Sequence, residues 1–475
     1  MVLFVLDEFS LGTMMTASKT IDAQRFPQLA SLGKTATWYR HHTTVADSTG
    51  SAVPAIYTGQ RPGVPDWGAI DKNHNLFEML KDRYRIQAYE PEPFAVVCDP
   101  ATCPATPSAS RLLGKAIHVP AWRLPKLAGG LAAIDGGGTR PLLWSQHLIL
   151  PHVPWTHVAN GDKYDDSSAP FPGMVLWGWA GSEYENQIAL NQQRMIAQAQ
   201  FADKIVGGLR RRLEAEGIWD KALVIVTADH GGAYTPGVQR RAIDTINFAE
   251  IASVPLLVKY PRQRRGRVSL RDTNSTQILP TVAKLTGSAA EYQGTSLLDA
   301  PPVKTLTVRT SDNDPSTVSL GISEMLSQQR AEIRQRDRRF PQTNIFRRSD
   351  NRQTIGKRVS TLAIRSGTSA GSLTLDNPEY FADLKPGSGW LPAAYLTARA
   401  SGLPTGVKIA VAVNGRVVGN GQTFSAPQSP FEPADPNPEV RLAAMLDPAW
   451  LRPGRAEVSF YREGGSSLQR VRLAP

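Results

Sequence analysis

Cysteine is scarce in this chain of 475 residues, which contains only Cys98 and Cys103. Two thiols without histidine partners cannot complete a four-ligand structural zinc site. They enclose the short segment Asp-Pro-Ala-Thr and have prolines close by, so we expect a local disulfide. A disulfide would indicate an oxidising, extracytoplasmic compartment. Two unrelated free thiols are the alternative.

Long apolar runs are also lacking. No stretch is long enough to cross a bilayer, and no secretion signal is present. The sequence opens directly on Val2-Leu3-Phe4-Val5-Leu6, which is the pattern of a buried strand. Because natural chains rarely begin inside their first core strand, we expect an N-terminal export or membrane segment in the full-length protein. The protein would then be periplasmic, or tethered on the outer face of the cytoplasmic membrane.

Acidic residues are fewer than basic ones: the chain has 42 Asp and Glu and 53 Lys and Arg, which gives a formal net charge of +11. The excess is spread along the chain, which favours anionic partners such as phospholipid, an envelope glycan or a membrane surface. Nucleic acid is not an expected partner, because no recognition motif is present and aromatics are not interleaved with the basic residues. The sequence indicates no particular oligomeric state.

Short apolar runs alternate with amphipathic stretches as far as about residue 290. This alternation predicts an α/β domain with a mostly parallel central sheet flanked by helices. The clearest helix spans about 188–215, where apolar residues keep a 3.6-residue rhythm and Gly217 follows the end. The candidate strands are 2–6, 85–89, 142–149, 223–228 and 255–259.

The pattern changes near residue 300. A run of Gln, Arg and Asp over 327–350 predicts a polar connector, which we assign to 301–344. Residues 407–418 then alternate into and out of an Asn-Gly turn, a strong hairpin signal, and 456–461 is a further strand. We therefore expect a catalytic domain over 1–300 and a small β-sandwich-like domain over 345–475.

Polar residues follow two of the predicted strands, at the edge where open α/β sheets bind ligands. Asp7 and Glu8 end the first strand, and Asp229 and His230 follow the strand 223–228. Carboxylate oxygens together with an imidazole nitrogen suit zinc or manganese, and fit calcium or magnesium less well. A carboxylate that caps a turn is the alternative for the first pair, and a structural turn is the alternative for the second.

A cluster of hydroxyls opens a short helical segment at Ser48 and Thr49. A hydroxyl at a helix N-terminus lies beside free backbone N–H groups and the positive end of the helix dipole, which favour a bound oxyanion. An ordinary N-cap serine or threonine is the alternative.

Together these motifs resemble the alkaline phosphatase and sulfatase superfamily over about residues 2–298. Sulfatases place a cysteine, oxidised to formylglycine, nine residues before a Thr-Gly, with an arginine four residues after the cysteine. Counting back nine from Thr58 reaches Thr49, and Val53 stands at the arginine position. A threonine in this place is similar to the phosphoglycerol and phosphoethanolamine transferase branches.

The resemblance implies roles for several residues. Thr49 is the expected nucleophile and a metal ligand, together with the ligands Asp7, Glu8, Asp229 and His230. The segment His147 to Pro154 resembles a His-x4-His-x-Pro element beside the substrate, which implies a catalytic role for His152 and substrate binding by His147.

Arg240 and Arg241 suit a phosphate oxyanion, although surface solvation explains them equally well. No histidine follows His230, whereas two-metal members of the superfamily have a later metal-binding histidine. We therefore expect one divalent metal ion, zinc or manganese.

The implied activity is a metal-dependent phospho-group transferase, or a hydrolase of phosphodiesters or phosphomonoesters, that forms a phosphothreonine-type intermediate. An envelope lipid or glycan is the expected substrate. A sulfuric ester hydrolase is one alternative, disfavoured by the absent cysteine. A non-catalytic metal- and ligand-binding envelope protein is another, disfavoured by the retained Thr, Asp and His.

Overall fold

A computed structural model describes residues 1–62, 74–99, 101–103, 131, 133–164, 171–288, 295–311, 317–348, 353–427, 437–464 and 467–475. The chain forms two compact units. The first comprises 1–152, 202–233 and 239–334, and the second comprises 153–201, 234–238 and 335–475.

The first unit is built on a seven-stranded sheet with the strand order β3-β4-β1-β7-β8-β2-β9. Neighbouring strands pair in parallel except that β8 is antiparallel to both β7 and β2, so the predicted mostly parallel sheet is confirmed. The strands are β1 (Val2–Asp7), β2 (Thr37–Thr43), β3 (Arg85–Tyr89), β4 (Leu142–Pro151), β7 (Val224–Ala228), β8 (Leu256–Lys259) and β9 (Arg267–Asn274).

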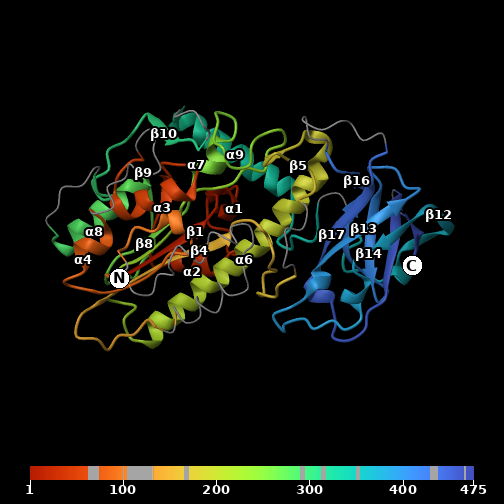
Figure 1. The fold of residues 1–475 in the computed structure, drawn as a ribbon, viewed down its shortest axis with the longest axis horizontal. Coiled ribbons are helices and arrows are strands. Elements are labelled where there is room, and N and C mark those ends of the chain that lie inside the picture. The colour runs from red at the N-terminus through yellow and green to blue at the C-terminus, as the bar shows by residue number, and fades with distance from the viewer. Residues whose placement is uncertain are drawn as a thin grey trace. The chain divides into compact units, whose positions relative to one another are not determined.

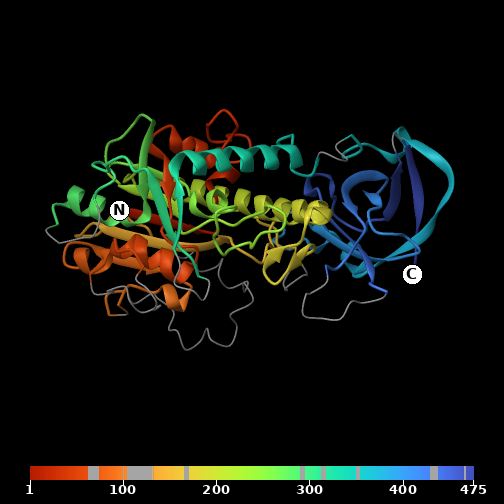
Figure 2. The same cartoon turned by 90° about the horizontal axis from the view of Figure 1, so that it is seen from above.

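Helices lie on both sides of this sheet, with α3 (orange) on one side and α9 (teal) on the other (Figure 2). On the α3 side, Leu3 and Val5 of β1 belong to one buried cluster with Val53 and Ile56 of α3. The helices, labelled in Figure 1, are α1 (Leu11–Met14), α2 (Pro27–Gly33), α3 (Thr49–Thr58), α4 (Leu76–Leu80), α6 (Glu185–Ala215), α7 (Phe248–Ala252), α8 (Ile278–Thr286) and α9 (Ile322–Arg339).

The five strands predicted in this sheet correspond to β1, β3, β4, β7 and β8, and the predicted helix 188–215 corresponds to α6. Strands β2 and β9 were not predicted. Strand β9 is an edge strand whose Val268 and Leu270 are more than half exposed, so it lacks the buried apolar run that identified the others. The segment 301–344, predicted as a polar connector, contains strands β10 (Thr305–Arg309) and β11 (Thr317–Gly321) and helix α9.

The β-rich domain is confirmed in the second unit, where eight strands form one sheet in the order β13-β12-β19-β18-β14-β15-β17-β16. Strand β13 also pairs with β17, so this sheet closes on itself instead of forming the two stacked layers of a sandwich. Alternating residues reveal strands but not their partners. The strands are β12 (Ala363–Leu375), β13 (Tyr395–Ser401), β14 (Lys408–Val413), β15 (Arg416–Gln422), β16 (Phe424–Ser425), β17 (Val440–Leu446), β18 (Val458–Gly464) and β19 (Ser467–Leu473).

The predicted hairpin joins β14 to β15. Its turn residues Asn414 and Gly415 have φ angles of 49° and 70°, the left-handed backbone that favours an Asn-Gly pair between twisted strands. No helix in the described part of the chain is both long and apolar enough to cross a bilayer.

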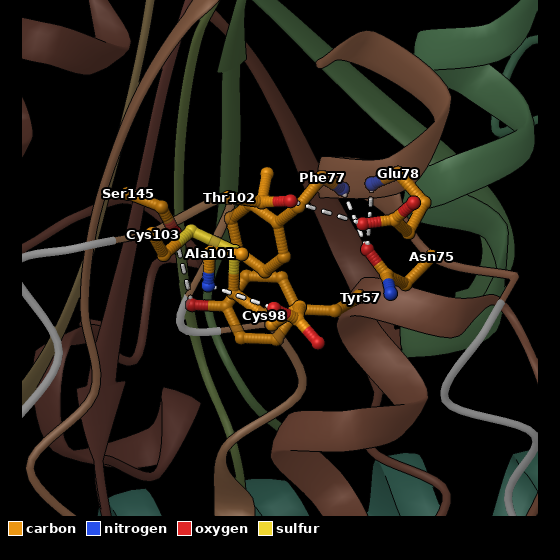
Figure 3. Close-up of a disulfide and its surroundings, with 10 residues drawn as sticks. Tyr57, Asn75, Phe77, Glu78, Cys98, Ala101, Thr102, Cys103 and Ser145 are labelled. Carbon is orange, nitrogen blue, oxygen red and sulfur yellow. Dashed lines mark hydrogen bonds between the residues drawn. A yellow bond between two sulfur atoms is a disulfide. The ribbon is translucent and has the colours of Figure 1, made fainter. Parts of the chain in front are cut away.

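The predicted disulfide between Cys98 and Cys103 is present, with a Cα–Cα distance of 6.0 Å. Both cysteines belong to the buried cluster beneath α3 and α4, and Figure 3 shows the bridge close to Tyr57. The Thr102 hydroxyl donates to Glu78 Oε1 at 3.3 Å, which attaches the bridged loop to α4. The bridge therefore closes a short loop against the core.

Replacing both cysteines by serine should destabilise the first unit by about 2 kcal/mol, because the open loop gains freedom in the unfolded chain. The measurement is the thermal unfolding midpoint of the double variant beside that of the intact protein. Reduced wild-type protein is the matched control and should lose a similar amount. An unchanged midpoint in both samples would contradict a stabilising bridge.

Asp203 of α6 caps the N-terminus of α2, where Phe26 provides no side-chain cap. Its carboxylate accepts the backbone N–H groups of Gln28 at 3.0 Å and Leu29 at 2.7 Å. Burial raises the pKa of Asp203 to about 6, although these two hydrogen bonds act in the opposite direction. The folded protein therefore holds this proton more tightly than the unfolded chain does.

Since the folded pKa is raised, the contribution of Asp203 to stability is fully present below about pH 4 and is lost as pH rises through about 6. The Asp203→Asn variant should lack this decline, which we expect to be on the order of 2 kcal/mol. Denaturant unfolding at intervals from pH 4 to pH 7 measures it, with the exposed Asp82→Asn as control. A variant that keeps the wild-type slope would refute the assignment.

Candidate active site and metal centre

Three buried side chains from adjacent strands meet at one edge of the central sheet. Asp7 ends β1, His147 lies on β4 and Asp229 directly follows β7, and these strands are neighbours in the order β4-β1-β7. One ligand atom from each residue lies within 4.8 Å of the others. The three side chains are at most 1% exposed. Parallel strands thus bring residues from three distant segments to one point.

These residues fit a metal ion. Asp7 Oδ1, His147 Nε2 and Asp229 Oδ2 are buried and have no hydrogen-bond partner. Unpaired buried polar atoms are costly, and a divalent cation is a common solution for two carboxylates and an imidazole. The other oxygen of Asp229 accepts backbone N–H groups from Glu8 at 3.0 Å and His230 at 2.6 Å, which fixes the orientation of the carboxylate.

The charges in this cluster perturb one another. Burial, and then the charge of Asp229, raise the pKa of Asp7 well above its ordinary value. Burial alone would lower the pKa of His147, but Glu90, Asp7 and Asp229 outweigh it and raise this pKa to about 10. His147 Nδ1 is 2.8 Å from Glu90 Oε1, and His147 Nε2 is 3.6 Å from Asp7 Oδ2. These carboxylates therefore favour the protonated imidazole, and His147 would release the proton on Nε2 on binding a metal ion, because a ligating imidazole is neutral.

His147 was predicted as a substrate-binding residue, and the structure places it instead among the candidate metal ligands. Glu90, which orients His147, was not singled out at all. It directly follows the predicted strand 85–89, so the rule that identified Asp7 and Asp229 would also have found it. An acid that holds the second nitrogen of a ligating imidazole is a common feature of metal sites.

Glu8 and Arg240, predicted as a metal ligand and a substrate-binding residue, form an ion pair with each other. Both are buried, with exposed fractions of 5% and 1%. Burial acts to raise the pKa of Glu8, but Arg240 and its other cationic neighbours outweigh burial and lower this pKa to about 2. The positive charge of Arg240 is therefore neutralised by Glu8. Glu8 also has a left-handed backbone, with φ 63°, a strained conformation of the kind found at functional sites.

Thr49 is the first residue of α3, and the preceding Ser48 makes no side-chain cap hydrogen bond. Thr49 Oγ1 lies 3.4 Å from His230 Nε2 and 3.5 Å from Arg241 Nη2. The nearby Asp47, which was not predicted, is also buried and accepts the backbone N–H of Ile243 at 3.0 Å. The structure thus brings the hydroxyl of Thr49 into contact with the site.

Arg241 connects three of the predicted site residues. Besides its contact with Thr49, it donates to His152 Nε2 at 3.1 Å and to His230 Nε2 at 3.0 Å. His230 Nδ1 lies 2.8 Å from the carbonyl of Gly231, which can only accept, so Nδ1 is the donor; Arg241 can only donate, so Nε2 is the acceptor in this arrangement. A guanidinium held beside a hydroxyl is well placed for an oxyanion.

The glycine after His230 is required by a close approach. A Cβ on Gly231 would clash with the carbonyl of Glu250 in α7, and the N–H of Gly231 donates to the carbonyl of Ile251 at 2.8 Å. Packing against α7 therefore requires a glycine at position 231.

Part of the chain matches a known protein family. The Sulfatase family model matches residues 136–288, which include His147, His152, Asp229 and His230. An ulvan-active sulfatase from Formosa agariphila is 26% identical over 147 residues, which are 30% of this chain and 28% of that protein. The match thus spans less than a third of the relative's length.

Two solved structures share the fold. One, determined in complex with its substrate D-glucosamine-2-N,6-O-disulfate, has a TM-score of 0.52 at 13% identity and covers 69% of this chain and 92% of that chain. A 2-O GAG sulfatase has a TM-score of 0.50 at 13% identity and covers 69% of this chain and 86% of that one.

Purified protein should carry about one zinc or manganese ion per chain, because the residues that the structure describes contain one set of buried ligands of this kind. His147→Asn and Asp229→Asn should each weaken metal affinity by more than the ~10–100-fold typical of residues that only orient a ligand. Elemental analysis and metal titration measure this, with Asp203→Asn as a buried carboxylate control. Two tightly held ions per chain, or full affinity in both variants, would contradict this centre.

Proposed function

We propose that this chain is a member of the alkaline phosphatase and sulfatase superfamily that acts on a phosphate ester. It would transfer or hydrolyse the ester in a metal-dependent reaction. Thr49 is the proposed nucleophile. The reaction would pass through a phosphothreonine-type intermediate, which water or an acceptor hydroxyl then resolves.

The observation that carries this proposal is the position of Thr49 Oγ1. It is 3.4 Å from His230 Nε2, the nitrogen that accepts a hydrogen bond from Arg241, and it lies at the N-terminus of a ten-residue helix. The first helical hydrogen bonds are donated by Ser51 and Ala52, so the N–H groups of Thr49 and Gly50 precede them. Such N–H groups, with the helix dipole, favour a negatively charged group beside the hydroxyl.

Each nearby side chain has a defined contribution. His230 Nε2 can accept the proton of the Thr49 hydroxyl as the oxygen bonds to phosphorus and the ester oxygen departs. Arg241 can neutralise the non-bridging oxygens of the transferred group, since it already contacts Thr49 Oγ1. His152, 21% exposed, is the proposed donor of a proton to the departing oxygen.

Asp7, His147 and Asp229 would hold the metal ion, with Glu90 fixing the ring of His147. When bound, a divalent ion supplies positive charge that stabilises the transferred group as its charge grows. Glu8 and Arg240 neutralise each other beside this cluster and keep the turn after β1 in place.

Sulfate ester hydrolysis is the second candidate, favoured by the Sulfatase family match and by the similarity to an ulvan-active sulfatase. Thr49 stands where sulfatases have the cysteine that becomes formylglycine, which favours phosphate. Chromogenic phosphomonoester, phosphodiester and sulfate ester substrates distinguish the two, and turnover of none of them would support a non-catalytic binding protein.

We further propose an anionic phospholipid or envelope glycan as substrate and an extracytoplasmic location. The net charge of +11 and the disulfide support these proposals. Alkylation of protein collected without reductant tests the location, because two reactive thiols would oppose it.

Thr49→Ala should lower kcat by about 10³-fold or more, as loss of a covalent nucleophile usually does. Ser48→Ala is the matched control and should keep nearly full activity, because the Ser48 side chain makes no cap hydrogen bond. Both variants should remain folded. Steady-state kinetics with the preferred chromogenic ester measure the difference.

The reverse pattern, an inactive Ser48→Ala and an active Thr49→Ala, would move the nucleophile by one residue. Full activity in both variants would exclude a covalent intermediate at this helix.

A further inference from the structure

A cavity of about 210 Å³ in the first unit lies apart from the residues of the candidate active site. One wall is formed by a single face of α9, where Leu326, Gln329, Arg330, Ile333 and Arg334 recur at helical spacing. The remaining lining residues come from the turn after α1 and from β2. None of them is a predicted catalytic or metal-ligating residue.

Positive charge surrounds this cavity. Lys19, Arg330 and Arg334 are exposed, Arg40 is half-buried, and no ion pair of these four is found within the described ranges. The Arg40 guanidinium donates to the carbonyl of Lys19 at 3.4 Å, which leaves its charge uncompensated. His41 also lines the cavity, but it is already paired with Asp272 at 3.2 Å.

A buried donor lines the same cavity. Gln329 is only 3% exposed, and its Nε2 has no hydrogen-bond partner in the described structure. A buried amide without a hydrogen bond costs about 1–3 kcal/mol of stability. We therefore expect a bound molecule to accept a hydrogen bond from Gln329. The Gln329 amide and the four basic side chains together provide hydrogen-bond donors and positive charge. Such a combination binds an oxyanion.

The apolar part of the lining restricts the ligand further. Met15 and Ile333 are 2% and 3% exposed and, with Leu326, give the cavity a hydrocarbon surface beneath the charged side chains. Cavities that hold a whole drug-sized molecule have ~300–1,000 Å³, so this one suits a single charged group with a short stem. A bare inorganic anion would leave the apolar surface without a contact.

Hydrogen bonds close the turn that presents Lys19. Thr16 Oγ1 lies 2.8 Å from Thr20 Oγ1 and accepts the N–H of Thr20 at 3.2 Å. Lys19 has a left-handed backbone, with φ 61°, which is uncommon for a residue with a side chain. The charge of Lys19 is thus supplied by a hydrogen-bonded turn.

We propose that this cavity is a second ligand site, which binds a phosphate or sulfate monoester carried on a short apolar stem. Arg40, Arg330, Arg334 and Lys19 bind the oxyanion, Gln329 donates to it, and Met15, Leu326 and Ile333 contact the stem. The site is independent of the proposed reaction, because it shares no residue with the candidate active site. The same chemistry is presented by a free monoester and by a lipid headgroup.

Calorimetric titration of the full chain with hexyl phosphate and hexyl sulfate tests the proposal. At least one should bind more tightly than both inorganic phosphate and hexanol, because only the monoesters satisfy the cations and the apolar surface together. The double variant Arg330→Gln/Arg334→Gln and the single variant Gln329→Leu should each weaken this binding about 10-fold or more.

Arg338→Gln is the matched control, because it removes one exposed arginine from the same helix without altering the cavity lining. It should bind the probe as the wild type does. Since Arg330 and Arg334 are exposed, their replacement leaves the core intact, and circular dichroism verifies this.

Arg241→Gln distinguishes the two sites. Binding that disappears in Arg241→Gln and persists in the cavity variants would place the probe at the candidate active site and overturn the proposal. Equal binding of hexanol, or of inorganic phosphate, would overturn it as well. Sedimentation with phosphatidylglycerol vesicles, against phosphatidylcholine vesicles, then assigns the source: cavity-dependent sedimentation indicates a lipid headgroup, and its absence indicates a free monoester.

Discussion

Two carboxylates, Asp7 and Asp229, leave adjacent parallel strands at the same edge of the sheet, and neither is more than 1% exposed. Buried like charges at this separation require positive charge beside them. A divalent ion held by these carboxylates and by His147 of the neighbouring strand would supply it, and Glu90 holds the His147 ring in place. The pairing of β4, β1 and β7 therefore determines the candidate metal centre, and the rest of the site is arranged around it.

The two arginines near the site have different roles. Arg240 forms a buried ion pair with Glu8, and this pair anchors the strained turn after β1. Arg241, the adjacent residue, also lies near this carboxylate, with Nε 3.9 Å from Glu8 Oε1. In addition it hydrogen-bonds to Thr49, His152 and His230, the residues placed to meet an oxyanion. The Thr49 hydroxyl, at the start of α3, thus lies close to both His230 and Arg241.

Much of the architecture could be predicted from local patterns. Buried strands such as 2–6 and 223–228 are continuous apolar runs, α6 keeps a helical rhythm, and the Asn414-Gly415 turn fixes its hairpin. Strand β9 could not be predicted in this way, because its Val268 and Leu270 are exposed at a sheet edge. The closed sheet of the second unit also could not be predicted, because closure depends on β13 meeting β17, and alternation does not specify partners.

The residues that end the strands could be read from the sequence, which therefore predicted that Asp7, Asp229 and His230 gather at one edge. Thr49 begins a helix and was assigned through the family resemblance. The sequence also predicted the disulfide, with two free thiols as the alternative, because its only two cysteines lie close together. Three features became evident in the folded chain alone: His147 joins the carboxylates, Glu8 binds Arg240, and a cationic cavity forms against α9. Each of these depends on contacts between segments far apart in the chain, and the chemistry of a side chain does not reveal which distant partner will neutralise it.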